Sequence, residues 1–251
     1  MLKYIIAVIL ILPVLIIMLP LFLIMAIKPD LFSFKFRYKY VRFIVKWACF
    51  ALRVDFKVEG YENIPENGSF LIAPNHQSFF DALSFIAVNK KPVAMVAKIE
   101  TKKMPVVNLL ERILGNFFLD RENIRKSLQL MKDLEEFLNK NPDVGVVIFP
   151  EGTRTKDPNL KIDEFKGGTF KVAYKVKGAV IPSVICGTTR ILKLKWYWKH
   201  RVDIKFGKTL NYDDYKDMTT VELANYCRNF SVENLEKILE YNDCRKKVKE
   251  K

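Results

Sequence analysis

Two short blocks, far apart in the sequence, contain residue types that could do chemistry together. The first, NHQSFFD at 75–81, places His76 five residues before Asp81, and a carboxylate so placed can orient an imidazole base. The second, FPEGTR at 149–154, offers a carboxylate, a flexible glycine and a guanidinium in a tight turn. An oriented imidazole can activate a hydroxyl, and a guanidinium can hold a phosphate. Together the blocks predict base-assisted chemistry on a phosphate-bearing hydroxyl compound.

The first block follows a strand-like run and precedes an apolar helical run. Ser78 and Asp81 fit an S-x-x-D capping box, which predicts that the helix begins at Ser78 with His76 just before it. The chain would then bend so that Asp81 accepts the Nδ1 hydrogen of His76 and leaves Nε2 free to take a proton. The alternative is that Asp81 only caps the helix and His76 is a turn residue. Ser78 is the rival nucleophile, but no G-x-S-x-G elbow surrounds it.

The second block follows VGVVIF, the strongest apolar run of its region. Loops that bind ligands gather at strand ends in α/β sheets. Gly152 lets the backbone approach a ligand closely, and Arg154 can grip phosphate oxygens in bidentate fashion. The alternative is a charged turn closed by a salt bridge between Glu151 and Arg154.

Two further basic residues stand at the ends of β-like runs. Lys98 ends one run, and Arg121 follows another in GNFFLDR (115–121). One basic residue at a strand end is ordinary and usually solvated, but three at successive strand ends, with Arg154, predict a phosphate pocket. Backbone N–H groups near Ser78 or Gly152 are candidate donors to an oxyanion.

Short strands alternate with helices over residues 55–251, which predicts an α/β domain whose central sheet is mixed and largely parallel and is flanked by helices. A helix is expected over the apolar stripe from Ile124 to Leu138, and a last one from the capping box Thr219-x-x-Glu222 into the basic tail. The β-like runs are Phe56–Val58, Phe70–Ala73, Val93–Ala97, Phe117–Leu119, Val144–Phe149, Ala179–Ile185 and Val202–Phe206.

The N-terminus is apolar. No residue from Tyr4 to Ile27 is charged, and this run is long enough to cross a bilayer core of about 30 Å. A cleaved signal peptide is disfavoured because the run is too long and lacks a small-x-small site. Pro13 and Pro20 leave a broken or half-inserted helix as an alternative to a straight span.

The net charge of +14 would suit either nucleic acid or an anionic membrane. A helical wheel favours the membrane, because it predicts a basic amphipathic helix in the headgroup layer directly after the apolar run. An ordinary surface helix on a protein core is the alternative. One side of the wheel is basic and carries Lys35, Lys39, Arg42, Lys46 and Arg53. The other side is apolar and carries Phe36, Phe43, Ile44, Trp47, Phe50 and Leu52.

Residues 1–54 are accordingly expected to be a membrane-associated segment, with no nucleic-acid partner. The excess of Lys and Arg after the apolar run predicts that the domain at 55–251 lies on the cytoplasmic side. The four cysteines are widely spaced, which indicates free thiols in a reducing compartment. With two histidines and no His/Cys cluster, we expect no metal site.

As a set, the blocks resemble those of the glycerolipid acyltransferases, specifically the 1-acylglycerol-3-phosphate acyltransferase family. NHQSFFD matches the family's N-H-x-x-x-x-D, GNFFLDR its G-x-x-F-x-D-R, FPEGTR its E-G-T-R, and IPSVI (181–185) its final proline block. The match covers roughly residues 55–210. Two departures are Gly167, where a second lysine is common, and Ser183, where an aliphatic residue is usual.

The resemblance implies acyl transfer from a thioester to the free hydroxyl of lysophosphatidic acid, giving phosphatidic acid. It implies that His76 is the general base and that Asp81 orients it. No bound cofactor is expected; acyl-CoA or acyl-carrier protein would be the co-substrate, and lysophosphatidic acid and an anionic membrane surface the partners. The alternatives are an acyltransferase for another lysophospholipid and a non-catalytic basic membrane-surface protein. The implied site for the acceptor phosphate consists of Lys98, Arg121, Glu151, Gly152 and Arg154.

Overall fold

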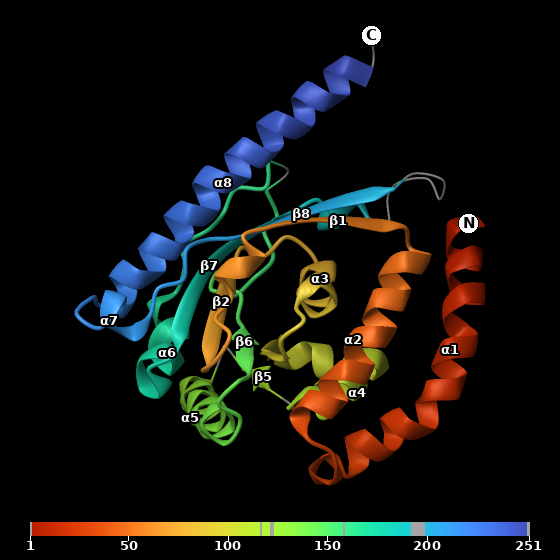
Figure 1. Ribbon diagram of the computed structural model, residues 1–251, viewed down its shortest axis with the longest axis horizontal. Helices are drawn as coiled ribbons and strands as arrows, with labels where there is room; N and C mark the ends of the chain where they lie inside the picture. The colour runs from red at the N-terminus through yellow and green to blue at the C-terminus, as the bar shows by residue number, and fades with distance from the viewer. Residues whose placement is uncertain (1, 116, 121–122, 158, 192–198, 250–251) are drawn as a thin grey trace.

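The computed structural model describes residues 2–115, 117–120, 123–157, 159–191 and 199–249. Six strands form the main sheet in the order β1-β8-β7-β2-β6-β3 (Figure 1). Strands β7 and β8 run antiparallel, whereas the other four neighbouring pairs run parallel. The mixed, largely parallel sheet predicted from the sequence is confirmed.

Each expected β-like run contains a strand, although the run at 93–97 is divided between two strands. The strands are β1 (Val54–Glu59), β2 (Phe70–Pro74), β3 (Val93–Met95), β4 (Ala97–Lys98), β5 (Phe118–Leu119), β6 (Gly145–Val147), β7 (Ala179–Cys186) and β8 (His200–Phe206). The helices are α1 (Leu2–Ile27), α2 (Phe34–Ala51), α3 (Phe80–Val88), α4 (Pro105–Leu114), α5 (Ile124–Lys140), α6 (Lys171–Val176), α7 (Tyr212–Tyr215) and α8 (Thr220–Lys249). Strands β4 and β5 form a separate parallel pair.

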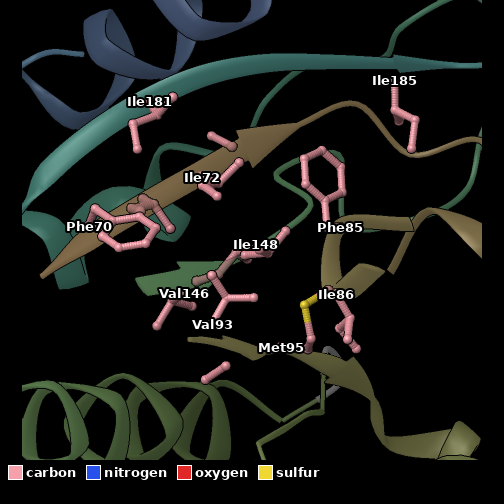
Figure 2. Packing of buried hydrophobic residues seen from close by; sticks show 14 of the residues in the cluster. Phe70, Ile72, Phe85, Ile86, Val93, Met95, Val146, Ile148, Ile181 and Ile185 are labelled. Atoms are coloured by element: carbon pink, nitrogen blue, oxygen red, sulfur yellow. The ribbon is translucent and has the colours of Figure 1, made fainter. Parts of the chain in front are cut away.

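Helices on both faces bury the central strands completely, as is usual for parallel sheets. Every residue of β2 is buried, and so is every residue of β6. Figure 2 shows Ile72 of β2, Val146 of β6 and Val93 of β3 packing together, with Phe85 of α3 close by. This core fixes the strand ends that carry the sequence blocks.

Helix α8 starts where the sequence predicts. The Thr219 N–H donates to Glu222 Oε2 over 2.7 Å, and the Glu222 N–H donates to Thr219 Oγ1 over 3.2 Å. Both halves of the capping box are therefore present. The helix then lies along β7, where Ser231 Oγ donates to the Ser183 carbonyl over 2.8 Å.

Helix α1 runs without a break through Pro13 and Pro20, and Figure 1 shows it curving toward its C-terminal end. By length and composition alone, Ile5–Ile27 could cross a membrane, and 11% of its most apolar window is buried in the protein. Exposed apolar residues include Ile17 and Ile27. So much exposed apolar surface is rare on a soluble monomer, which indicates membrane association.

Helix α2 belongs to the same core as the sheet. It begins after Ser33, whose Oγ accepts the Phe36 N–H. The buried Tyr38 hydroxyl lies 3.1 Å from the Ile86 carbonyl and 3.0 Å from the Asn89 carbonyl, both at the end of α3. The side that packs on the domain carries Phe34, Tyr38, Val41, Ile44, Val45 and Cys49.

The apolar face expected for this helix is therefore divided. Ile44 is buried in the domain core, whereas Phe36, Phe43 and Phe50 remain exposed beside the lysines. The wheel placed these residues together because it could not show which part of a wide apolar arc the domain would cover. The buried side has the packing of a helix on a protein core, and membrane binding by the exposed side remains a proposal.

Two alanine substitutions on α2 should separate these two sides. Phe34 is buried, and its ring lies 4.9 Å from that of Phe137, so Phe34→Ala should lower the unfolding free energy by about 3 to 5 kcal/mol. Phe43 is 52% exposed, and Phe43→Ala should change it by less than about 0.5 kcal/mol. Urea unfolding in mild detergent measures both, and similar losses would contradict the packing described.

Candidate active site

The sequence blocks meet at the carboxyl ends of the parallel strands β2 and β6. His76 lies two residues beyond β2, and FPEGTR begins two residues beyond β6. The Thr155 N–H donates to the His76 carbonyl over 2.9 Å, so the two loops are joined directly. Lys98 ends β4 nearby. Arg121 lies outside the described residues.

His76 and Asp81 form a hydrogen-bonded pair. His76 Nδ1 lies 2.8 Å from Asp81 Oδ2; Asp81 is fully buried, whereas the His76 side chain is 18% exposed. The imidazole stacks on the Phe149 ring at 4.1 Å. Because an ionised carboxylate only accepts hydrogen bonds, Nδ1 carries the proton and Nε2 is left as the acceptor.

Asp81 also holds the turn before α3, as one half of the expected capping box. The other half is absent, because the Asp81 N–H donates to the Ser78 carbonyl and not to its side chain. Asp81 Oδ2 accepts the N–H groups of Gln77 and Ser78 over 2.5 and 2.8 Å. Ser78 Oγ accepts the Phe80 N–H over 3.0 Å, and the helix starts at Phe80, two residues later than expected. The N–H group of Ser78 is thus engaged, so among the candidate oxyanion donors near the helix start this one is not available.

A fourth donor to this carboxylate comes from the other side of the site. The buried Thr188 side chain, on the loop after β7, donates from Oγ1 to Asp81 Oδ1 over 2.5 Å. Sequence reasoning missed Thr188, because the residue is separated from Asp81 by more than a hundred positions. Its place just after the block IPSVI (181–185) is the one signal that pointed to it.

Glu151 links the turn FPEGTR to the backbone of two neighbouring segments. It is buried, and its Oε1 accepts the His76 N–H over 2.6 Å while its Oε2 accepts the Asp163 N–H over 3.1 Å. Burial raises its pKa to about 7, although these two hydrogen bonds act to lower it. No ion pair joins Glu151 to Arg154 among the described residues, so the proposed salt bridge of the turn is not formed.

A cavity of about 210 Å³ opens beside His76, with Lys98, Gly152 and Arg154 in its wall. Gly152 has a φ of +73°, a backbone conformation that is strained for residues with a side chain. The Gly152 N–H donates to the Phe149 carbonyl. That N–H is therefore also engaged. The interior is apolar and is lined from α3 and α4 by Ala82, Leu83, Ile86, Val107, Leu110 and Leu114.

The cations of this cavity differ in their surroundings. Lys98 Nζ lies 2.7 Å from Glu100 Oε1. Arg154 is exposed, and within the described part of the chain its guanidinium has no hydrogen bond or ion pair. Of these two cations, Arg154 is thus the one more able to bind an anionic group.

One acid in the cavity wall was not anticipated. Glu111 of α4 is buried, accepts a hydrogen bond from the Phe117 N–H and has no described partner for Oε2. Burial raises its pKa to about 8, so the neutral form predominates at pH 7.

The described residues contain no group of three or more His, Cys, Asp or Glu side chains arranged to hold a metal ion. Cys49, Cys186 and Cys227 are buried free thiols. At one departure from the family pattern, Gly167, a Cβ would lie 3.1 Å from Thr220 at the start of α8, which favours a small residue there. The other, Ser183, is buried in β7.

Comparison with known proteins agrees with this arrangement. A profile of the family described as Acyltransferase matches residues 55–186, slightly more than half of the 251 residues. A solved structure, titled as the 1-acyl-sn-glycerophosphate (LPA) acyltransferase PlsC from Thermotoga maritima, aligns with a TM-score of 0.65 and 29% identity. That alignment covers 80% of this chain and 79% of the other.

Curated relatives carry the same kind of name. The chain is 33% identical over 161 residues to the 1-acyl-sn-glycerol-3-phosphate acyltransferase LPAT1, chloroplastic, of Arabidopsis thaliana, covering 62% of this chain and 44% of that protein. It is 28% identical over 148 residues to a 1-acyl-sn-glycerol-3-phosphate acyltransferase of Borreliella burgdorferi, covering 59% and 58%. The chain thus spans about half the length of these curated relatives.

The buried acid in the cavity wall predicts a pH dependence of stability. Between the ordinary pKa of 4.5 and the folded value of about 8, the folded chain holds a proton on Glu111 that the unfolded chain releases. The unfolding free energy should therefore fall by a few kcal/mol as the pH rises through this window. In Glu111→Gln this part of the fall should be absent.

Urea unfolding at pH 5 and pH 9 measures the difference. Glu136→Gln, which removes an exposed acid on α5, is the matched control. Its unfolding free energy should fall between pH 5 and pH 9 by as much as that of the parent protein. If the unfolding free energy of Glu111→Gln fell with pH as much as that of the parent, Glu111 would not be buried as described.

Proposed function

The chain belongs to the acyltransferase family, and on this basis we propose that it transfers an acyl group from a thioester donor to the free hydroxyl of 1-acylglycerol-3-phosphate, giving phosphatidic acid. The observation that carries the proposal is the His76–Asp81 pair at a cavity with a cationic rim and an apolar interior. The names of the relatives support this acceptor.

His76 acts as the general base. An alcohol is a weak nucleophile near neutral pH, and a positioned base contributes about 10²- to 10⁴-fold to its attack. The hydroxyl oxygen attacks the thioester carbonyl while Nε2 takes its proton. When the C–S bond breaks, the imidazolium returns the proton to the departing sulfur. Asp81 holds the ring in the required tautomer and stabilises the transient positive charge.

The acceptor phosphate binds at Lys98 and Arg154, with Gly152 allowing close approach and Arg121 as a further candidate. Arg154 contributes most, because it has no competing partner among the described residues. Glu151 serves this site indirectly, since its carboxyl holds the backbone of His76 beside the turn that carries Arg154. The apolar interior between α3 and α4 accommodates an acyl chain.

The acceptor is itself a membrane lipid, which gives the apolar surface of α1 a purpose. Residues 1–54 keep the site at the level of the headgroups: the exposed residues of α1 contact acyl chains, and Phe36, Phe43 and Phe50 of α2 enter the interface beside the lysines. The basic residues that follow α1 support a cytoplasmic position for the domain. The donor is acyl-CoA or acyl-carrier protein.

Removal of the base should abolish the reaction without unfolding the chain. His76→Ala should lower thiol release from an acyl thioester plus lysophosphatidic acid at least about 100-fold. Asp81→Asn should also lower it strongly, by permitting the other tautomer, and should lower thermal stability as well because four donors meet this carboxylate. Near-normal turnover by a folded His76→Ala variant would refute the proposed mechanism.

Thr188 should act as a positioning residue through Asp81. Thr188→Val keeps the shape but removes the hydroxyl donor, so kcat should fall about tenfold while KM for the lysolipid is unchanged. Thr188→Ser should restore most of the rate, and Thr189→Val, at the neighbouring position, is the control. A rise in KM alone, or failure of serine to rescue, would show that the side chain serves packing only.

A further inference from the structure

A further cavity, here called the interhelix cavity, opens between α1 and the junction of α2 with β1. Its volume is about 340 Å³. Ile6 and Leu10 of α1 form one wall, and the chain from Phe50 to Asp55 forms another. Figure 1 shows the N-terminal part of α1 beside the end of α2. His76 does not line this cavity, so it is separate from the proposed active site.

The helical walls of the interhelix cavity are apolar and are joined to each other. Ile6 and Leu10 lie one turn apart on α1, and α2 contributes Phe50. Trp47 Nε1 donates to the Leu10 carbonyl over 2.8 Å, which holds the two helices together at this place. Leu10 is 37% exposed and Phe50 66% exposed, although both are large apolar residues. This lining can accommodate a hydrocarbon chain.

The cavity continues an exposed apolar surface of α2. Phe36, Phe43 and Phe50 are spaced seven residues apart, so they lie along one side of the helix, and all three are exposed. This side of α2 is the one proposed above to enter the membrane interface. Since Phe50 also lines the interhelix cavity, a lipid that contacts the phenylalanines can extend one chain into it.

Two cations, Arg53 and Lys199, belong to the wall of the same cavity. Their backbones are close, because the His200 N–H donates to the Arg53 carbonyl over 2.8 Å where β8 begins beside β1. Both side chains are exposed, and neither has a hydrogen bond or ion pair within the described part of the chain. Asp55, an acid of this wall, lies 3.8 Å from Lys57 Nζ instead. The two cations are therefore left for an anionic group.

The backbone at Arg53 gives a second indication that its side chain is used. Its φ is +58°, in the left-handed region, at the position after α2 where glycine usually ends a helix. The Arg53 N–H donates to the Phe50 carbonyl over 2.8 Å, which helps to hold this conformation. An arginine at a position suited to glycine lowers stability, and a role for the guanidinium would account for its presence.

The interhelix cavity and the proposed active site lie at the same edge of the sheet. Strands β1 and β8 run antiparallel to β7, which is parallel to β2. The starts of β1 and β8, at Val54 and His200, therefore lie at the edge where β2 ends and His76 follows. One membrane surface can thus serve both.

We propose that the interhelix cavity binds one molecule of an anionic membrane phospholipid. One acyl chain lies between α1 and α2 against Leu10 and Phe50, and the phosphate is held by Arg53 and Lys199. Such a lipid fixes the orientation of the domain on the bilayer, which the general attraction of lysines to a charged surface does not. The proposal goes beyond the proposed function and does not depend on the reaction at His76.

Native mass spectrometry of the full-length protein can count the lipids that it retains on release from dodecyl maltoside micelles containing phosphatidylglycerol. The parent protein should retain one molecule. Arg53→Gln combined with Lys199→Gln should lower the retained fraction about tenfold, because two charge-assisted contacts are lost. Lys132→Gln combined with Lys140→Gln, which removes the same charge from exposed positions on α5, is the matched control. Equal losses in the two double variants would overturn the site.

Three further measurements separate the headgroup from the chain. Leu10→Trp, which places a larger ring in the cavity wall, should also lower retention of phosphatidylglycerol. Phosphatidylcholine, whose headgroup has no net charge, should be retained far less, and excess inorganic phosphate should leave phosphatidylglycerol in place. Equal retention of phosphatidylcholine would overturn the role of the cations. Displacement by inorganic phosphate, or unchanged retention in Leu10→Trp, would overturn the role of the chain.

Arg53→Gly tests the arginine apart from the stability of the fold. Glycine adopts the left-handed conformation without strain, so the midpoint of thermal unfolding in lipid-free detergent should rise by about 2 to 4 °C. Retention of phosphatidylglycerol should fall at the same time. Circular dichroism measures the midpoint. Unchanged retention in this variant, whatever its midpoint, would overturn the assignment of the phosphate to Arg53.

Discussion

The buried carboxylate of Asp81 is the interaction on which the rest of the site depends. It accepts four hydrogen bonds, from the imidazole of His76, the backbone of Gln77 and Ser78, and the hydroxyl of Thr188. An ionised carboxylate in the protein interior is costly unless its lone pairs are satisfied in this way. These hydrogen bonds join the end of β2, the start of α3 and the loop after β7. The contacts that stabilise the carboxylate therefore also position His76.

A second buried carboxyl group plays the complementary part. Glu151 accepts backbone N–H groups from His76 and Asp163, and in doing so holds the turn after β6 against the loop after β2. Because its contacts are internal, the guanidinium of Arg154 remains directed to solvent and the cavity rather than to Glu151. Two acidic side chains thus organise the loops, and Arg154 is left for an anionic ligand.

The N-terminal helices connect this site to its surroundings. Helix α1 leaves most of its apolar residues exposed, whereas α2 inserts one side into the domain core and keeps phenylalanines and lysines on the other. Hydrogen bonds from Tyr38 to the end of α3 link α2 to the helix that begins at the base. The exposed surface of α2 is therefore connected to the helix that follows His76, as the proposed acceptor in the bilayer requires.

The sequence determined the strands of the sheet and the start of α8, because burial between helices requires apolar strands and capping leaves a local signature, as at Thr219 and Glu222. It also predicted the pairing of His76 with Asp81, because the two residues are only five positions apart. Contacts between distant segments carry no such signature. Only the tertiary structure showed that Thr188 completes the carboxylate's partners, that Glu151 serves the backbone instead of Arg154, and that α2 is half buried. Hydrogen bonds and packing between segments 48 to 107 positions apart depend on how the chain is folded, and local patterns do not record them.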